Sequence, residues 1–395
     1  ELAGGITVDL ASGDYGDGLT RLGKMAQVAV KPENEFNLKT SKLDLSTVEV
    51  LVDGSPVDYS YTPETNQIAL TEERGPFSVA KVSYCEKEEA PMIASKVIAG
   101  GFHSCAILID GKAKCWGGNS QGQLGLGNVE NLGDDETLED VPTLAFSQKV
   151  IDMSAGLNHT CAVLEDGSVK CWGQNNKGQL GLGHTDTLGD DETLDTIASI
   201  PLAGPAKRIY SGTFYNCALL ENKKVQCWGD NSVGQLGYGS TETLGDNETL
   251  ENLPLLNLSA DVIQMDISTV SSHTCAALSN GELKCWGINN NGQLGYGHTN
   301  NLGDDEDLSS FGSVPFGNNV LQLATGFNHT CAITGGQKAR CWGANLSGQT
   351  GLGVVQTIGD DEAANSANYI DLSGTGSDSF NMIAAGNNHS CVIGI

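Results

Sequence analysis

Hydrophobic and polar positions alternate from Cys161 to Cys171, on either side of the turn dipeptide Asp166-Gly167. This alternation around a glycine-containing turn predicts a β-hairpin. A short apolar run, residues 150–156, precedes the hairpin, and a further apolar piece, residues 200–202, comes before the next such run. The pattern therefore predicts four short strands in this stretch of the chain.

Close copies of this stretch recur along the chain. The first cysteine of each hairpin lies at Cys105, Cys161, Cys217, Cys275 and Cys331. A second cysteine follows ten residues after each of these, and a tryptophan directly follows the second cysteine. Four short strands in a repeat of this length are typical of a propeller blade, which cannot bury its faces alone.

Each end of the repeat region holds half a unit. Cys85 lacks the Trp-Gly continuation, and residues 388–391 repeat only the first half of the unit. Joined, the two ends predict one composite blade, with inner strands from residues 380–386 and 389–395 and outer strands from residues 80–85 and about 90–95. The expected fold is all-β, a six-bladed β-propeller over residues 77–395 that is closed by this composite N-/C-terminal blade.

Residues 1–76 lack the repeat and are expected to form a small N-terminal β-rich module. The pattern predicts a short amphipathic helix over residues 12–26 and strands over residues 47–51, 57–61 and 67–70. This stretch weakly resembles the end of a von Willebrand A-type protein. The resemblance implies the tail of a truncated upstream domain. The DxSxS metal motif of that family is absent from the chain, so no metal site is carried over.

The cysteine spacing predicts disulfides, because opposed positions of an antiparallel hairpin lie close enough for one. Five bridges are expected within hairpins and a sixth across the composite blade: Cys105–Cys115, Cys161–Cys171, Cys217–Cys227, Cys275–Cys285, Cys331–Cys341 and Cys85–Cys391. The alternatives are reduced core cysteines and zinc ligands, and the spacing is not the C-x₂₋₄-C of zinc sites. A fully paired set indicates an oxidising compartment, and therefore a secreted or cell-surface protein.

The formal net charge is −28. Nucleic acids and anionic membrane surfaces both require clustered Lys and Arg, so neither is an expected partner. No apolar run approaches the length of about 18 to 20 residues that a transmembrane helix needs, and no direct membrane insertion is expected. Glu1 does not begin a signal peptide, and the chain is expected to be part of a longer surface protein.

The repeat resembles that of the regulator of chromosome condensation family. The resemblance rests on residues 156–162, Asp166-Gly167, residues 172–175 and the GQLGLG run at residues 178–183, and it extends over residues 77–395. It implies a β-propeller, although familiar members have seven blades. Members include a nuclear guanine-nucleotide exchange factor that binds chromatin, and secreted bacterial proteins that bind and inhibit β-lactamases. The acidity and the paired cysteines favour the secreted bacterial type.

One position of the repeat carries His103, His159, His273, His329 and His389, with Tyr215 in the remaining unit. A ring of imidazoles could bind a metal or an anion. The favoured alternative is that each side chain bonds local backbone and braces its turn.

Acidic loops of the type Gly-Asp-Asp-Glu recur in five units, with Asn247 replacing one aspartate. Clustered carboxylates could coordinate calcium, although no loop has the D-x-D-x-D-G ladder. The favoured alternative is bracing of turns. No cofactor other than calcium is expected, and the candidate calcium ligands are Asp134, Asp135, Asp190, Asp191, Asp304, Asp305, Asp360 and Asp361.

No serine nucleophile elbow, P-loop, HExxH or dinucleotide fingerprint occurs in the chain, so an enzyme is not expected. Binding residues are instead expected where the units differ, on one rim of the ring. The candidates are Phe102, Leu157, Asn158, Phe214, Tyr215, Phe327 and Asn328. The alternative is that these aromatics fold under neighbouring loops. The predicted function is non-catalytic recognition or adhesion, with an extracellular protein or glycan as partner; the alternative is a secreted inhibitor or regulator of an extracellular enzyme.

Overall fold

The computed structural model describes residues 35–37, 48–52, 55–62, 67–70, 80–83, 93–317, 319–371 and 379–394. The chain divides into two compact units, Glu1–Met92 and Ile93–Ile395. The division thus falls later than the boundary after residue 76 that the start of the repeat suggested. The predicted helix over residues 12–26 lies outside the described residues.

The described part of the first unit is made of β-strands. They are β1 (Glu35–Asn37), β2 (Glu49–Val52), β3 (Ser55–Pro56), β4 (Tyr59–Thr62), β5 (Gln67–Leu70) and β6 (Ala80–Ser83). They form two three-stranded sheets, in the orders β1-β5-β4 and β3-β2-β6. The three strands predicted here from alternation are therefore present, as β2, β4 and β5.

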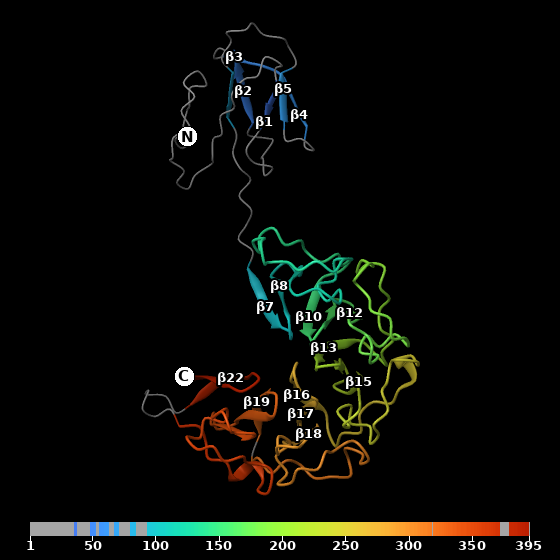
Figure 1. Ribbon diagram of the computed structural model, residues 1–395, viewed down its shortest axis with the longest axis vertical. Coiled ribbons are helices and arrows are strands. Elements are labelled where there is room, and N and C mark those ends of the chain that lie inside the picture. Colours follow the sequence, from blue (N-terminus) through green and yellow to red (C-terminus); the bar gives the residue numbers. More distant parts are fainter. Residues whose placement is uncertain are drawn as a thin grey trace. The chain divides into compact units, whose positions relative to one another are not determined.

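The described part of the second unit contains six antiparallel sheets, counted in chain order from the first to the sixth (Figure 1). The first five have three strands each: β7 (Ala94–Ala99), β8 (His103–Leu108) and β9 (Ala113–Gly117); β10 (Val150–Ala155), β11 (His159–Leu164) and β12 (Val169–Gly173); β13 (Ala206–Ser211), β14 (Tyr215–Leu220) and β15 (Val225–Gly229); β16 (Val262–Ile267), β17 (His273–Leu278) and β18 (Leu283–Gly287); β19 (Val320–Thr325), β20 (His329–Thr334) and β21 (Ala339–Gly343). The sixth has β22 (Phe380–Ala385) and β23 (Ser390–Gly394). The all-β propeller prediction is confirmed.

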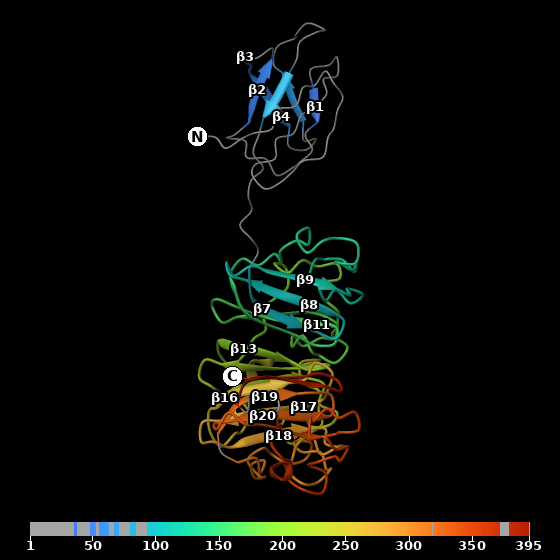
Figure 2. The same cartoon turned by 90° about the vertical axis from the view of Figure 1, so that its left-hand side faces the viewer.

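Successive sheets follow an arc, and the first strand of each, here called the inner strand, contacts the inner strand of the next sheet (Figure 1). In the view turned by 90°, β7, β8 and β9 lie side by side as one blade (Figure 2). The described helices are two short 3₁₀ turns, η2 (Leu250–Asn252) and η3 (Ala364–Ser366). Among the described residues no helix has the length and apolarity to cross a membrane.

The hairpin of each of the first five sheets has the predicted register. In the second sheet Cys161 lies directly opposite Cys171. In the second sheet Gly167 takes the left-handed turn conformation, with a φ of 80°. In the third sheet Lys223 occupies the equivalent position, with a φ of 64°. The third hairpin has no glycine in its turn, residues 221–224, and forms with Lys223 in the left-handed conformation.

The predicted fourth strand of each blade is not a strand. Around residues 200–202 the ladder is reduced to one bond, in which Ile200 N–H donates to Val169 O at 2.8 Å. Pro201 follows and has no N–H to continue a ladder. The same single bond recurs in the other three-stranded sheets of the second unit, for example from Leu256 N–H to Val225 O. These apolar pieces cover the blade edge without extending the sheet.

The outer strands predicted for the composite blade belong elsewhere, whereas its predicted inner strands are present as β22 and β23. Ala80–Ser83 forms β6 and pairs with Glu49–Val52 in the first unit, with Val82 opposite Val50. Ala94 and Ser95 begin β7, the inner strand of the first sheet, where Ala94 lies opposite Leu108. The first sheet needs this strand for its own three-stranded ladder, so it cannot serve as an outer strand of a composite blade. Residues 85 and 90–92 lie outside the described part of the chain.

The core lies between successive sheets. Trp172, Trp228, Trp286 and Trp342 are fully buried. Close backbone approach makes this possible: a Cβ on Gly178, whose φ is 65°, would lie 2.5 Å from the Asp246 nitrogen of the next sheet's loop. A larger residue at Gly178 would therefore separate the two blades.

Candidate functional site

The predicted binding residues lie in the turns that join each inner strand to the second strand of its sheet. These turns, here called the rim turns, are residues 100–102, 156–158, 212–214, 268–272, 326–328 and 386–389. Neighbouring rim turns are joined by backbone hydrogen bonds, for example from Gly101 N–H to Gly156 O at 3.0 Å and from Phe327 N–H to Gly386 O at 3.3 Å. The structure therefore gathers them on one face of the arc.

The backbone also fixes each candidate residue within its own sheet. Phe102 O accepts the Gly118 N–H at 2.8 Å, and Phe214 O accepts the Asp230 N–H at 2.9 Å. Phe102 and Phe327 remain 64% and 42% exposed. Phe214, Leu157, Asn158 and Asn328 are half-buried. The rim therefore offers side chains to a partner from the first, second, third and fifth sheets.

Tyr215 does not belong to this exposed set, and its prediction as a binding residue was wrong. Its side chain is fully buried. The hydroxyl donates to His273 O at 2.9 Å and lies 3.0 Å from Thr274 Oγ1, both in the next sheet. Burial raises the pKa of Tyr215. The residue is a bridge between sheets.

The histidines at the same repeat position also act between sheets and not on local backbone. His103 Nε2 lies 2.7 Å from Thr160 Oγ1, and the equivalent contacts of His159, His273 and His329 reach Asn216, Thr330 and Ser390. The Thr160 hydroxyl in turn donates to Gln123 O, the oxygen that also accepts the Trp172 indole N–H at 3.0 Å. Each of these histidines is thus committed to the neighbouring blade.

Burial also keeps these imidazoles neutral. It lowers the pKa of His159 to about 4 and that of His273 to about 3. Burial lowers the pKa values of His103 and His329 to about 4 as well. They are therefore neutral hydrogen-bonding groups at pH 7.

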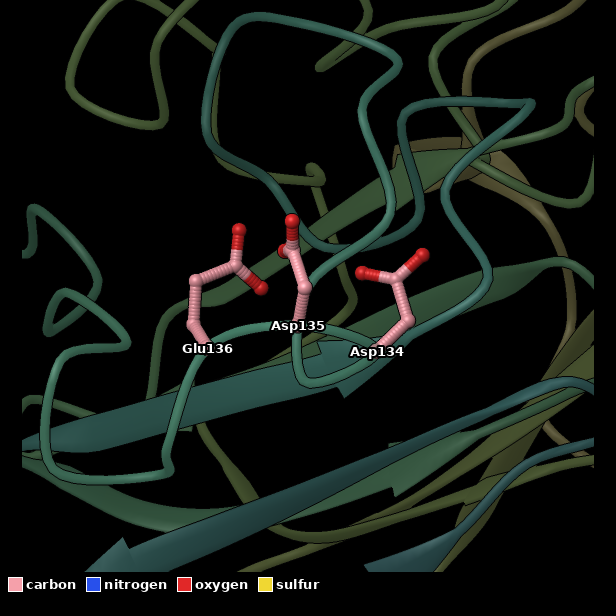
Figure 3. A group of neighbouring side chains, drawn as sticks. All are labelled: Asp134, Asp135 and Glu136. Carbon is pink, nitrogen blue, oxygen red and sulfur yellow. The ribbon is translucent and has the colours of Figure 1, made fainter.

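The acidic loops fold as tight turns closed by their own glutamates. Glu136 accepts the Gly133 N–H at 2.9 Å, and Glu192 accepts the Gly189 N–H at the same distance. Figure 3 shows the carboxyl groups of Asp134, Asp135 and Glu136 projecting to the same side of one turn. Hydrogen bonding and charge repulsion from Glu136 raise the pKa of Asp135. The glutamates therefore brace these turns, and the aspartates remain close together beside them.

The same loops were the calcium candidates. In the first, second, fourth and fifth sheets the three acidic groups of the loop have oxygens within 4.8 Å of one another, and these are Asp134, Asp135 and Glu136; Asp190, Asp191 and Glu192; Asp304, Asp305 and Glu306; and Asp360, Asp361 and Glu362. Calcium takes six to eight oxygen ligands. Each loop can supply three carboxylates, so carbonyls or water would have to complete the shell. Calcium binding stays a prediction.

The rim turns and the acidic loops lie at the same end of each blade. In the first sheet Gly117 lies opposite His103, which directly follows the rim residue Phe102. On its other side Gly117 forms a bridge to Leu132, which directly precedes the acidic loop. The same bridge recurs from Gly173 to Leu188 and from Gly229 to Leu244. One face therefore carries exposed phenylalanines and carboxylates.

The five predicted hairpin disulfides are present, with Cα–Cα distances of 4.0 to 4.1 Å. Their sulfur pairs are those of an oxidising environment. Cys391 carries an exposed thiol, and its expected partner Cys85 lies outside the described residues. The Cys85–Cys391 bridge therefore stays a prediction.

Several polar residues on the inner strands were not among the predicted site residues. Asp152, Arg208, Tyr210 and Asp266 line a cavity of about 470 Å³ between β7, β10, β13 and β16. The sequence signal that could have found them is the change of chemistry at one repeat position, from aspartate to arginine to glutamine along successive inner strands.

Comparison with known proteins identifies the family. A family model described as an RCC1-like domain matches residues 63–392. The ultraviolet-B receptor UVR8 of Arabidopsis thaliana is 34% identical over 266 residues, which are 65% of this chain and 54% of UVR8. The probable E3 ubiquitin-protein ligase HERC6 of Homo sapiens is 32% identical over 210 residues, 53% of this chain and 20% of that protein. The chain thus spans about half of UVR8 and less of HERC6, and both relatives are eukaryotic.

Solved structures share the fold. Human WBSCR16 superposes with a TM-score of 0.62 at 18% identity, over 81% of this chain and 77% of that chain. Yeast RCC1 (Prp20), solved bound to Kap60, gives a TM-score of 0.59 at 18% identity, over 80% and 70% of the two chains. The sequence match, the repeated sheets and these superpositions agree: the chain belongs to the RCC1-like domain family.

Proposed function

We propose that this propeller is a non-catalytic recognition domain that binds a basic protein surface through its rim face in an extracellular setting. The single observation that carries this proposal is the exposure of Phe102 and Phe327 on a face that also bears the acidic loops. Aromatic side chains on a rigid backbone are typical anchors of protein interfaces, since they bury a large area for little conformational entropy.

The negative charge of the rim face favours a basic partner. Four of the acidic loops carry three clustered carboxylates each. The chain as a whole has a formal net charge of −28. Such a face attracts a basic partner over a distance and repels an acidic one, so electrostatics would raise the association rate at low salt.

Structural relatives support a protein as the partner. Yeast RCC1 was solved as a complex with Kap60, and a second structure of Prp20p from Saccharomyces cerevisiae is described together with its binding to Gsp1p and histones. The five disulfides support the extracellular setting, because such bridges persist in oxidising compartments. These two points support a secreted or cell-surface location, with adhesion as the proposed role.

The test compares two variants with matched chemistry. Phe102→Ser combined with Phe327→Ser removes the rim anchors, and Ile109→Ser removes an exposed hydrophobic residue from the β8–β9 turn at the opposite end of the blade. Binding of the wild type and both variants is measured on a glycan array and on an array of secreted and cell-surface proteins. The rim variant is expected to bind its protein partner at least about tenfold more weakly, and Ile109→Ser is expected to bind normally.

Other outcomes are informative. Equal binding by both variants would remove the rim from the proposal. Binding to glycans alone would replace the protein partner with a carbohydrate. If the captured partner is an enzyme and loses its activity in the complex, the domain is an inhibitor or regulator of an extracellular enzyme, the alternative function.

A further inference from the structure

The inner strands of successive sheets are joined by short polar side chains that accept a hydrogen bond from the next strand. Asp152 Oδ2 accepts the Ile209 N–H at 3.0 Å, and Gln322 Oε1 accepts the Ile383 N–H at 2.9 Å. With its amide oxygen facing β19, Gln264 accepts the Leu323 N–H at 3.1 Å. These three residues occupy the same register position, just after the bulge of β10, β19 and β16. It is here called the latch position.

Side chains two residues further along the inner strands also accept a hydrogen bond from the next strand. Ser154 Oγ accepts the Ser211 N–H at 2.9 Å, and Asp266 Oδ2 accepts the Thr325 N–H at 2.6 Å. Both residues lie opposite the first cysteine of their hairpin. The inner strands are thus fastened at two points wherever short acceptors are present.

Two of the first five sheets lack an acceptor at both points. In the first sheet these positions hold Lys96 and Ile98, and Lys96 donates to Asp152 and Met153 of the next strand. The third sheet is the other. Arg208 stands at the latch position of β13 and Tyr210 stands two residues further along the strand. A guanidinium has no acceptor atom, so Arg208 cannot receive an N–H from β16. The Tyr210 hydroxyl is buried and makes no hydrogen bond of regular geometry with a described residue, although the Arg208 side chain lies beside it. Arg208 and Tyr210 thus lie together at the cavity that they line, and neither accepts a hydrogen bond from the next inner strand.

Two carboxylates also line the cavity, and only that of Asp152 has a cationic partner among the described residues. Asp152 forms an ion pair with Lys96, whose ammonium also donates to Met153 O at 3.0 Å. Asp266 accepts both the N–H and the hydroxyl of Thr325. Lys207 and Arg208 have no carboxylate partner within the described part of the chain. The lining thus holds three cationic and two carboxylate side chains, an excess of one positive charge.

Apart from Ser154, the remaining lining is apolar. Val97, Ile151 and Ile267 face the same space of about 470 Å³, a volume within the range of small-molecule sites. Val97 and Ile151 are 66% and 48% exposed, so apolar surface is available next to the guanidinium. A guanidinium and a hydroxyl match the geometry of a carboxylate, and the apolar walls match a hydrocarbon body. The overall negative charge disfavours a multiply charged anion.

We infer that the cavity between β7, β10, β13 and β16 binds a small monocarboxylate with an apolar body, held by Arg208 and Tyr210. None of the predicted rim residues lines this cavity, so the inference does not depend on the proposed recognition function. The carboxylate would accept from the Arg208 guanidinium and from the Tyr210 hydroxyl, with Lys207 nearby.

The test uses hexanoate as the probe, with hexanamide and inorganic phosphate as comparisons, titrated by calorimetry into the whole chain. Arg208→Gln is the central variant, because glutamine already serves as a latch at Gln264 and Gln322. It is expected to melt at the same temperature as the wild type or higher, and to bind hexanoate at least about tenfold more weakly. Tyr210→Phe is expected to weaken binding by about threefold to tenfold.

The matched control is Lys149→Gln, which removes one positive charge at an exposed position that does not line the cavity. It is expected to bind hexanoate like the wild type. Absence of hexanoate binding by the wild type at millimolar concentration would overturn the inference, as would equal binding by Arg208→Gln. Phosphate binding as tight as that of hexanoate, or hexanamide binding as tight, would overturn the assignment to a carboxylate with an apolar body.

Discussion

The sheets inside the arc and the sheets at its two ends carry the same repeat, but equivalent side chains of the repeat are buried to different extents. Trp172, Trp228, Trp286 and Trp342 are fully buried, whereas Trp116 of the first sheet is only half-buried. At the other end, Cys391 is exposed although it has the register of Cys331, which is fully buried. The difference shows that the interface between successive blades, more than the blade itself, buries the repeat.

The largest expected effect on stability is that of the predicted disulfide between the two ends of the repeat region. A Cys85–Cys391 bridge would close a loop of roughly 300 residues and, in the loop-entropy model, contribute about 6 kcal/mol to the free energy of unfolding. Peptide mapping of the unreduced protein is expected to find these two residues linked. Cys391→Ser is then expected to lower the denaturation midpoint, and the double variant with Cys85→Ser should match it. Two free thiols in the mapping experiment would contradict this prediction and leave the ends unjoined.

The next effect compares the tryptophans directly. Trp228→Ala removes a buried side chain and the hydrogen bond from its indole to Gln179 O, so it is expected to cost about 3–5 kcal/mol of stability. Trp116→Ala is expected to cost about half as much, since part of its ring already contacts water. Urea unfolding of both variants measures the difference. Equal losses would show that the end sheet is as well covered as those inside the arc.

A smaller effect should appear on acidification. Burial lowers the pKa of His159 from an ordinary value of 6.5 to about 4. Between these values the unfolded chain binds a proton that the folded chain does not bind. The contribution of this residue is thus fully present above pH 6.5 and is lost on acidification toward pH 4, by up to about 1.4 kcal/mol per pH unit.

The measurement is the free energy of unfolding from pH 7 to pH 4. His159→Gln is expected to show a shallower loss than the wild type, because the titrating group is gone. His389→Gln, at an exposed position of the sixth sheet, is the control and should follow the wild type. If the His159 variant keeps the full wild-type slope, the buried imidazole is not the source of the acid sensitivity.

The smallest effect belongs to the acidic loops. If they bind calcium, saturation to one half stabilises the fold by about 0.4 kcal/mol per site, so calcium should raise the melting temperature slightly and chelation should lower it. Asp190→Asn and Asp191→Asn together should remove the contribution of one loop, while the glutamine variant of exposed Glu221 should not change it. A melting temperature that does not respond to calcium or chelator would leave these loops with the bracing role of Glu192 alone.

Local features of the chain were predictable because the groups involved are close in sequence. A ten-residue spacing around Asp166-Gly167 is sufficient to place Cys161 opposite Cys171. The absence of a fourth strand could not be predicted from the sequence. The apolar pieces have the composition of strands and differ from strands only in their hydrogen bonds. Tyr215 was misplaced for a similar reason. Its position next to Phe214 suggests the rim, but its hydroxyl reaches a carbonyl 58 residues away.

The sequence by itself determined the repeat, the hairpins, the five hairpin disulfides and the propeller fold, because each depends on periodicity and on contacts within one unit. Only the tertiary structure decided which side chains form hydrogen bonds to the next blade and which do not. Asp152, Arg208 and Gln264 occupy one repeat position, yet the first and last accept hydrogen bonds from the next sheet and the second cannot. That distinction arises from the approach of strands more than 50 residues apart, which no local pattern records.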